Sequence, residues 1–281
     1  MTTELRIDAL LPQEMATRAE YLGVRKAEMP GLMMFTLAIL AGAFIGLGAM
    51  FATIVTAGAS GVLPYGIVRL LAGLVFCLGL ILVVVGGAEL FTGNNLIVMA
   101  WASGKVTSQA LLRNWIIVYI GNFSGAIATA VMVFTSKQYL FGNGNVGQTA
   151  LGIANSKVHL GFIQGIALGV LCNALVCLAI WMTFSARSTM DKIAAIIFPI
   201  TAFVAAGFEH SIANMYFIPI GLLIKYLDPA FVGTTNLDVS GLTWGTFLIN
   251  NLLPVTIGNI IGGSIFVAAV YWSVFLRQKK A

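Results

Sequence analysis

The sequence predicts an all-α membrane protein with six transmembrane helices, and three observations support this fold class. Hydrophobic residues make up 59% of the 281 residues and charged residues only 9%, with a mean hydropathy of +0.96. A soluble domain carries roughly 25% charged residues. Several apolar segments reach the length of about 20 residues that a bilayer crossing requires. The two halves of the chain also share sequence motifs, which indicates a 3+3 repeat.

The predicted spans are separated by polar links. They cover residues 33–56, 67–102, 115–134, 159–184, 193–226 and 244–276. The second and fifth spans contain glycine, glutamate and asparagine at membrane depth, so both are expected to be interrupted. Irregular backbone is tolerated there only when it is buried in protein or lines a cavity. Residues 135–156 and 228–243 are predicted loops, and Pro254 is a candidate break in the last span.

The first 30 residues carry charges of both signs and form a separate N-terminal segment, 1–30. Apolar residues recur at helical spacing between Leu10 and Val24, which predicts a short amphipathic helix. Two interpretations stay open. The helix is either a solvated or interfacial arm, or a plug beneath a pore. The channel domain is expected over residues 31–276 and a short tail over 277–281.

The distribution of lysine and arginine predicts the orientation in the membrane. Six crossings place both ends of the chain on one side, and eleven of the fifteen basic residues fall there. They are Arg6, Arg18, Arg25, Lys26, Lys105, Arg113, Arg187, Lys192, Arg277, Lys279 and Lys280. Cytoplasmic loops carry the excess of positive charge, so both termini are expected in the cytoplasm and the protein in the cytoplasmic (inner) membrane. The basic residues are scattered, which argues against nucleic acid as a partner.

Two motifs occur twice in the same order. G-x-E-x-x-x-G-N starts at Gly87 and recurs from Gly207 as G-x-E-x-x-x-A-N; G-N-x-x-G-A starts at Gly121 and recurs from Gly258 as G-N-x-x-G-G. Three helices per half is an odd number, so the second half must enter the membrane from the opposite side. An inverted repeat places the solute site at the midplane, where the broken helices meet. The repeats run over about 31–135 and 157–276.

The glutamates of the first motif, Glu89 and Glu209, occupy equivalent positions. Either they handle protons or ions directly, or they are structural and accept hydrogen bonds from backbone N–H groups at a half-helix N-terminus. A symmetric pair suits a shared architectural role, so the structural interpretation is favoured. Asn94 and Asn214 complete the same motif and are assigned to the helix breaks with them.

His210 is the favoured functional residue, because its repeat counterpart is the apolar Leu90. A histidine can hold or release a proton near neutral pH; the alternative is a buried histidine with satisfied hydrogen bonds. Thr92, in the other interrupted segment, is expected to hydrogen-bond His210 and to fix its tautomer. Lys157 stands near the outer end of the fourth span. It either attracts anions into a vestibule or is a helix-end lysine that reaches for the interface.

Three stretches resemble the formate/nitrite transporter family. They are A-E-L-F-T at 88–92, G-F-E-H-S-I-A-N-M at 207–215 and P-V-T-I-G-N-I-I-G-G at 254–263. The likeness covers nearly the whole chain and is closest to the formate-channel branch, including N-S-K-V-H at 155–159. One departure is T-G-N-N at 92–95, where formate channels carry more serine and threonine.

The resemblance implies an aquaporin-like protomer in a homopentamer, with a pore in each protomer and an N-terminal segment that gates at low pH. It implies His210 as the pore histidine, Thr92 as its partner and Lys157 as the vestibule lysine. The implied constriction is Phe76, Leu80, Leu90 and Phe203, and the implied polar pore lining is Asn173 and Asn259. The expected function is movement of formate, or of formic acid coupled to protons, across the lipid bilayer. Nitrite, hydrosulfide, acetate and lactate remain alternative substrates.

Other classes of function are disfavoured. A neutral-solute facilitator of aquaporin type should carry two Asn-Pro-Ala loops, and the sequence has no Asn-Pro. An enzyme would need a nucleophile with its base, and Ser211 beside His210 is the only candidate; adjacent helix residues point in different directions. A pentameric scaffold would leave the buried polar loops unexplained. No enzymatic activity, cofactor or metal is expected.

Overall fold

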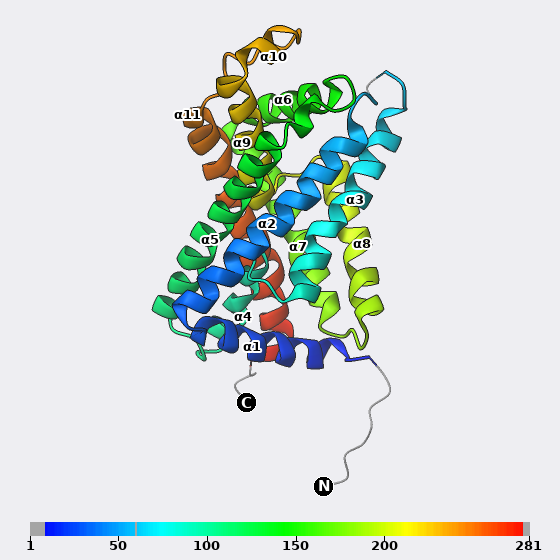
Figure 1. The fold of residues 1–281 in the computed structure, drawn as a ribbon. Coiled ribbons are helices and arrows are strands. Elements are labelled where there is room, and N and C mark those ends of the chain that lie inside the picture. Colours follow the sequence, from blue (N-terminus) through cyan, green and yellow to red (C-terminus); the bar gives the residue numbers. More distant parts are fainter. Residues whose placement is uncertain (1–8, 60, 278–281) are drawn as a thin grey trace.

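The structure is a computed structural model and describes residues 9–59 and 61–277. Parts of the predicted N-terminal segment (1–8) and tail (278–281) lie outside the described residues. Six helices within them are long and apolar enough to cross a membrane (Figure 1). They are α2 (Gly31–Thr56), α3 (Tyr65–Gly86), α5 (Ser108–Thr135), α7 (Phe162–Thr183), α8 (Thr189–Ala206) and the helix Trp244–Leu276.

Both predicted interruptions are confirmed. α3 ends at Gly86 and the chain continues through η1 (Gly93–Ile97) into α4 (Val98–Ala102), whereas α8 is followed by α9 (Ser211–Leu227). Gly87 and Gly207 follow the last turns of α3 and α8 with φ of 77° and 78°. Only glycine adopts this left-handed conformation without steric cost, so both helices end at the same motif position.

The last span is one helix, and the candidate break at Pro254 is not seen. It combines α11 (Trp244–Thr246), η3 (Phe247–Leu252), α12 (Leu253–Ile260), η4 (Ile261–Ala269) and η5 (Trp272–Leu276), where η3, η4 and η5 are π-helical. Proline lacks an N–H, and its ring crowds the carbonyl four residues earlier in an α-helix. The wider π turn that ends at Leu252 accommodates both effects, so the helix continues.

The predicted loops contain helices. α6 (Asn145–Val158) lies largely inside the predicted loop 135–156, which also holds η2 (Gln138–Leu140), and α10 (Pro229–Gly233) lies inside the other loop. Glycine and asparagine suggested irregular structure in the α6 segment. Its apolar residues nevertheless recur at helical spacing and are buried: Val146, Ala150, Leu151, Ala154 and Val158.

The N-terminal helix α1 (Pro12–Glu28) is longer than predicted and is docked on the bundle. It lies across one end of the spanning helices, and α6 lies near the opposite end (Figure 1). α1 packs against η1, α4 and η5. Lys105 forms an ion pair with Glu20 of α1, whose side chain is 8% exposed. These contacts attach α1 to the bundle, and they are compatible both with an interfacial arm and with a plug beneath a pore.

Small residues bring the helices of each half together. α2 packs against α5, and α7 packs against α12. A Cβ atom on Gly125 would lie 1.9 Å from the Ile39 oxygen, and one on Gly262 would lie 2.2 Å from the Val170 oxygen. No side chain fits at these distances, so the shared glycines of the second motif set the closest approach of the helix pairs.

Candidate functional site

Each helix interruption carries a glutamate that belongs to a hydrogen-bonded ring with a lysine and two asparagines. In the first, Glu89 Oε1 lies 2.6 Å from Lys26 Nζ, and its Oε2 accepts a hydrogen bond from Asn94 Nδ2 at 2.8 Å. Asn94 Nδ2 also donates to Asn114 Oδ1 at 2.9 Å. Asn114 Nδ2 then donates to the Lys26 carbonyl at 3.0 Å. The four residues close a ring that ties α1 to the first break.

The second interruption has the same ring. Glu209 Oε1 lies 2.6 Å from Lys157 Nζ, and Oε2 accepts from Asn214 Nδ2 at 2.7 Å. Asn214 Nδ2 also donates to Asn251 Oδ1 at 2.7 Å, and Asn251 Nδ2 donates to the Lys157 carbonyl at 2.9 Å. α6 thus stands to the second break as α1 stands to the first. This correspondence between opposite ends of the bundle is what an inverted repeat predicts.

The partners of the two glutamates differ from those expected. Backbone N–H donors were predicted, but the carboxylates bind lysine and asparagine side chains. The reason lies in the loops, where the N–H groups of Phe91 and Ser211 already donate to Asn122 Oδ1 and Asn259 Oδ1, each at 2.9 Å. The carboxylates therefore satisfy their charge with the ammonium groups that α1 and α6 supply.

Asn122 and Asn259 form a second symmetric pair. Asn122 Nδ2 donates to the Ala38 and Glu89 carbonyls at 2.8 and 2.9 Å. Asn259 Nδ2 donates to the equivalent carbonyls of Gly169 and Glu209, both at 2.9 Å. Asn259 was expected to line the pore. That role stays a prediction, and in the structure its side chain holds the backbone of the broken segment against α7.

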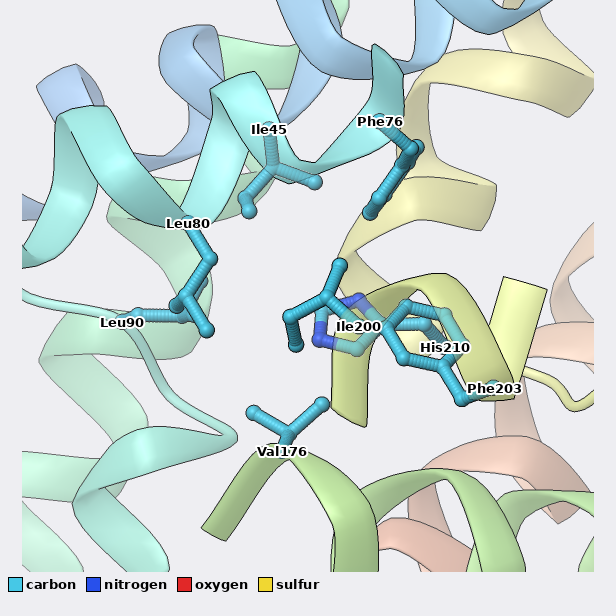
Figure 2. Close-up of a pocket in the computed structure, with 8 residues that line it drawn as sticks. All are labelled: Ile45, Phe76, Leu80, Leu90, Val176, Ile200, Phe203 and His210. Atoms are coloured by element: carbon cyan, nitrogen blue, oxygen red, sulfur yellow. The ribbon is translucent and has the colours of Figure 1, made fainter. Parts of the chain in front are cut away.

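The four residues predicted to form the constriction meet around a small cavity with His210. The cavity has a volume of about 10 Å³, close to the minimum that holds one water molecule. Figure 2 shows its lining residues, which come from both repeats. They are Ile45, Phe76, Leu80, Leu90, Val176, Ile200, Phe203 and His210. The only polar group among them is the imidazole.

The repeat explains which residues line this cavity. Ala38 and Gly169 accept equivalent hydrogen bonds, and Ile45 and Val176 each lie seven residues further on. Leu80 and Ile200 are likewise equivalent in α3 and α8, as are Leu90 and His210 in the loops. The lining therefore contains three symmetry-related pairs, so the cavity lies where the two halves meet. Ile45, Val176 and Ile200 were missed from the sequence, although extending the motif alignment would have found them.

The imidazole of His210 is held by two hydrogen bonds. Its Nδ1 accepts from the Ala213 N–H at 3.1 Å, which caps the N-terminus of α9. Its Nε2 lies 3.0 Å from Thr92 Oγ1. An accepting Nδ1 carries no proton, so the proton is on Nε2 and donates to the Thr92 hydroxyl. His210 is 3% exposed and stacks on Phe203, with ring centroids 5.9 Å apart.

Next to the His210–Thr92 pair lies a group of polar residues that has no counterpart in the other half of the repeat. Asn173 Nδ2 donates to Asn95 Oδ1 at 2.8 Å, to the Thr92 carbonyl at 3.2 Å and to the Asn259 carbonyl at 2.7 Å. Its Oδ1 has no hydrogen-bond partner among the described residues. Asn173 is not among the residues that line the cavity. The repeat counterparts of His210, Thr92, Asn95 and Asn173 are Leu90, Ile212, Met215 and Gly42.

A vestibule of about 980 Å³ reaches the constriction from the α6 side, and Phe76, Phe203 and His210 belong to its wall. Lys157 lines it too, but its ammonium is paired with Glu209 and lies 5.5 Å from the Phe217 ring centroid. Its positive charge is therefore offset. One side of α6 contributes polar residues to the wall of the vestibule: Asn145, Gln148, Thr149 and Ser156.

The sequence analysis singled out Lys157 but did not place it in a ring with Glu209, and it gave no role in a ring to Lys26, Asn114 or Asn251. Lys26 and Lys157 each lie five residues before the first residue of the next spanning helix, α2 or α7. Asn114 and Asn251 each lie eight residues before the asparagine of the second motif. A longer alignment of the two halves would have shown these equal spacings and identified the lysines and asparagines as equivalent pairs.

The fold and the site define a membrane transport protein: a six-span bundle in which two broken helices meet at an apolar constriction with a single imidazole. The sequence model of the formate/nitrite transporter family matches residues 13–273. The chain belongs to the formate/nitrite transporter family. Two relatives illustrate the match. "Formate channel FocA" of Escherichia coli (strain K12) is 46% identical over 99% of both chains, and "Formate channel FocA" of Haemophilus influenzae is 40% identical over 92% of both.

Two solved structures resemble the protein. A chain titled "Pentameric formate channel with formate bound" is 47% identical, with a TM-score of 0.82 over 88% of this chain and 98% of its own. One titled "FNT family ion channel" is 26% identical, with a TM-score of 0.80 over 93% of this chain and 98% of its own. The expected family and fold class are confirmed.

Proposed function

We propose that the protein conducts formate across the cytoplasmic membrane as a homopentamer with one pore in each protomer, and that protons accompany the formate. The proposal is supported by the relatives named formate channel, at up to 46% identity over nearly the full chain, and by the similar pentameric channel whose title names bound formate. Transport rather than catalysis is the activity proposed.

The observation that carries the proposal is the His210–Thr92 pair at an otherwise apolar constriction. An isolated carboxylate in a dry, apolar medium costs up to tens of kcal/mol, and it takes up a proton instead where it can. Neutral formic acid costs far less. A group that supplies a proton beside the apolar ring is therefore what passage of this anion requires.

The hydrogen bonds of His210 define how a proton is delivered. In the structure the imidazole is neutral, because Nδ1 is committed to the Ala213 N–H. Protonation at Nδ1 must break this bond and place a cation in a buried site. An anion that has reached His210 compensates both costs, so protonation and arrival of the anion are coupled. Proton transfer from the imidazolium to formate then yields formic acid, which crosses Leu80, Leu90 and Phe203.

Lys157 acts differently in this proposal from the free vestibule cation first expected. Its ion pair with Glu209 holds the loop that carries His210, because the backbone of Glu209 directly precedes it. Lys26 and Glu89 hold the other loop in the same way. Both glutamates are thus architectural, and neither takes up or releases the transported proton.

The orientation and the N-terminal helix belong to the same proposal. The excess of basic residues supports cytoplasmic termini, and α1 lies at the end of the bundle where the described chain also finishes (Figure 1). α1 then closes the cytoplasmic side. Lys26 of α1 pairs with Glu89 in the first broken helix, so release of α1 from the bundle at low pH would disturb the pore directly.

The test is uptake by proteoliposomes that contain the purified protein, with formate, nitrite and hydrosulfide compared at two pH values. We expect formate uptake that increases with an inward proton gradient, and liposomes with a His210→Phe variant as the control. Uptake of nitrite or hydrosulfide but not of formate would contradict the proposed substrate and would leave the assignment of the fold unchanged. Native mass spectrometry tests the pentamer.

A further inference from the structure

The vestibule wall contains two basic residues, Lys157 and Arg69. Glu209 offsets the charge of Lys157. Arg69 forms no ion pair within the part of the chain that the structure describes. It donates from Nε to the Ala205 carbonyl at 3.1 Å and from Nη2 to the Val204 carbonyl. The vestibule therefore keeps one arginine whose charge no carboxylate neutralises.

The position of Arg69 places it on the way to the constriction. Tyr65, Arg69, Ala72 and Phe76 lie on one face of α3, and all four line the vestibule. Tyr65 is 77% exposed, whereas Phe76 is 2% exposed and also lines the constriction. The rise of an α-helix puts the Arg69 backbone about 10 Å from that of Phe76. An anion that enters along α3 thus passes Arg69 before it meets the apolar ring.

The guanidinium is anchored with part of its donors free. Arginine has five N–H groups, and those bonded to Val204 and Ala205 are two of them. The other three donate to no protein atom in the described residues, and a pair of guanidinium N–H groups matches a carboxylate. The two carbonyls belong to the C-terminal turn of α8, where the helix dipole supplies about half a negative charge. They therefore fix the side chain and neutralise only part of its charge.

Arg69 is one-sided with respect to the repeat, as His210 is. It lies eighteen residues before Gly87, and the residue eighteen before Gly207 is Thr189. A Cβ atom on Gly207 would lie 3.5 Å from Arg69 Nη2, so the guanidinium packs against the residue where the break begins. A purely architectural residue would be expected in both halves, as the glutamate rings are.

We propose that Arg69 is an anion-binding residue of the vestibule that captures the small monovalent anion before it reaches His210. The inference rests on the proposed function and adds a specific capture step to it. Fixed positive charge in a cleft with low-dielectric walls focuses the field and raises the local anion concentration. Arg69 contributes to association of the anion and leaves the crossing step to His210 and the apolar ring.

The experiment measures initial formate uptake into proteoliposomes against formate concentration, at low and high ionic strength. Arg69→Gln should raise the half-saturating concentration about fivefold and change the saturating rate less than twofold. Added salt should slow wild-type uptake at low formate and affect the variant less, because salt screens the charge. Arg69→Lys should keep the salt dependence. Lys225→Gln is the matched control, since Lys225 also donates to backbone carbonyls but does not line the vestibule.

Two outcomes would overturn the capture role. One is an unchanged half-saturating concentration and salt dependence in Arg69→Gln. The other is a lower saturating rate with an unchanged half-saturating concentration in both Arg69→Gln and Arg69→Lys. That result would mean that Arg69 only holds the end of α8 in place. If wild-type protein carries nitrite or hydrosulfide but no formate, the substrate proposal fails, and the same series with the transported anion still tests Arg69.

Discussion

His210 and Thr92 join the two halves of the protein, because the Nε2 of His210 lies 3.0 Å from the Thr92 hydroxyl. His210 caps the helix that follows the second break, and Thr92 lies in the first. With Nδ1 accepting from Ala213, the imidazole must donate to Thr92. The hydroxyl proton of Thr92 is then free to meet an anion.

Replacing Thr92 tests whether this hydroxyl contributes to transport. Thr92→Val keeps the shape and removes the hydrogen bond to His210, so formate uptake should fall about tenfold, the effect of about 1.4 kcal/mol. Thr92→Ser keeps the hydroxyl and should retain most of the uptake. Initial rates in proteoliposomes measure both. Equal rates for Thr92→Val and wild type would remove the hydroxyl from the mechanism.

The lysines of the two ion pairs differ in burial although the glutamates do not, and this predicts different stabilities of the glutamate variants. The side chains of Lys157 and Glu209 are 15% and 6% exposed, whereas Lys26 is 32% exposed. A buried charge that loses its partner costs about 3–5 kcal/mol. Glu209→Gln should therefore lower the Tm of the detergent-solubilised protein more than Glu89→Gln does.

The double variant Lys157→Met/Glu209→Gln is the control for this prediction. It removes both charges, so it should recover most of the stability lost in Glu209→Gln. A double variant no more stable than the single one would show that the ion pair does not account for the loss.

The repeat predicts matched effects for Asn122→Ala and Asn259→Ala. Each change removes a bond to one loop N–H and two bonds to backbone carbonyls. A buried polar group left without its partner costs about 1–3 kcal/mol, so both variants should show similarly large decreases in Tm. Ser124→Ala on α5 is the control, because its hydroxyl bonds only the Ile120 carbonyl of its own helix. A large loss in only one asparagine variant would contradict the structural equivalence.

A pH-dependent contact fixes the end of the bundle near α10. Tyr139 Oη donates to Asp228 Oδ2 at 2.6 Å, and this bond holds the pKa of Asp228 below its ordinary value of 3.8. A carboxylate whose pKa is lowered by folding stabilises the folded protein at pH values above the unfolded-state pKa. This stabilisation is lost as the pH falls through the folded-state pKa. Asp228→Asn should thus lower the Tm at pH 7 but much less at a pH well below 3.8. The same Tm difference at both pH values would contradict this assignment.

Much of the fold was predictable because lipid imposes strong constraints on sequence. Six apolar segments and two interruptions follow directly from hydropathy and from polar residues at membrane depth. α6 was missed because Gly147, Gly152 and its asparagines resemble a loop, while its apolar face is visible only once a partner is known. The continuous last helix was missed because the π turn before Pro254 is a local accommodation that the sequence pattern does not show.

The residues of the site were expected from the short motifs, which carry His210 and Thr92, and from the family resemblance, which implies the four constriction residues. His210 and Thr92 were placed together, and the four constriction residues line one cavity. The lysine partners of Glu89 and Glu209 were not predicted, because Lys26 and Lys157 come from helices outside the repeated motifs and are brought in by folding. Those contacts decide which basic side chain of the vestibule keeps an unpaired positive charge. The sequence alone therefore does not show that Lys157 is paired with Glu209.

The most direct test of the account compares His210→Asn with wild type under an imposed proton gradient. Asparagine is a good N-cap, so this variant should keep the cap on Ala213 while it removes the titratable ring; His210→Phe removes both. The measurement is the initial rate of formate uptake into proteoliposomes with and without an inward proton gradient. We predict that the gradient accelerates uptake by wild type and leaves His210→Asn unaffected. The same acceleration by the gradient in both proteins would contradict the role of His210 in delivering the proton.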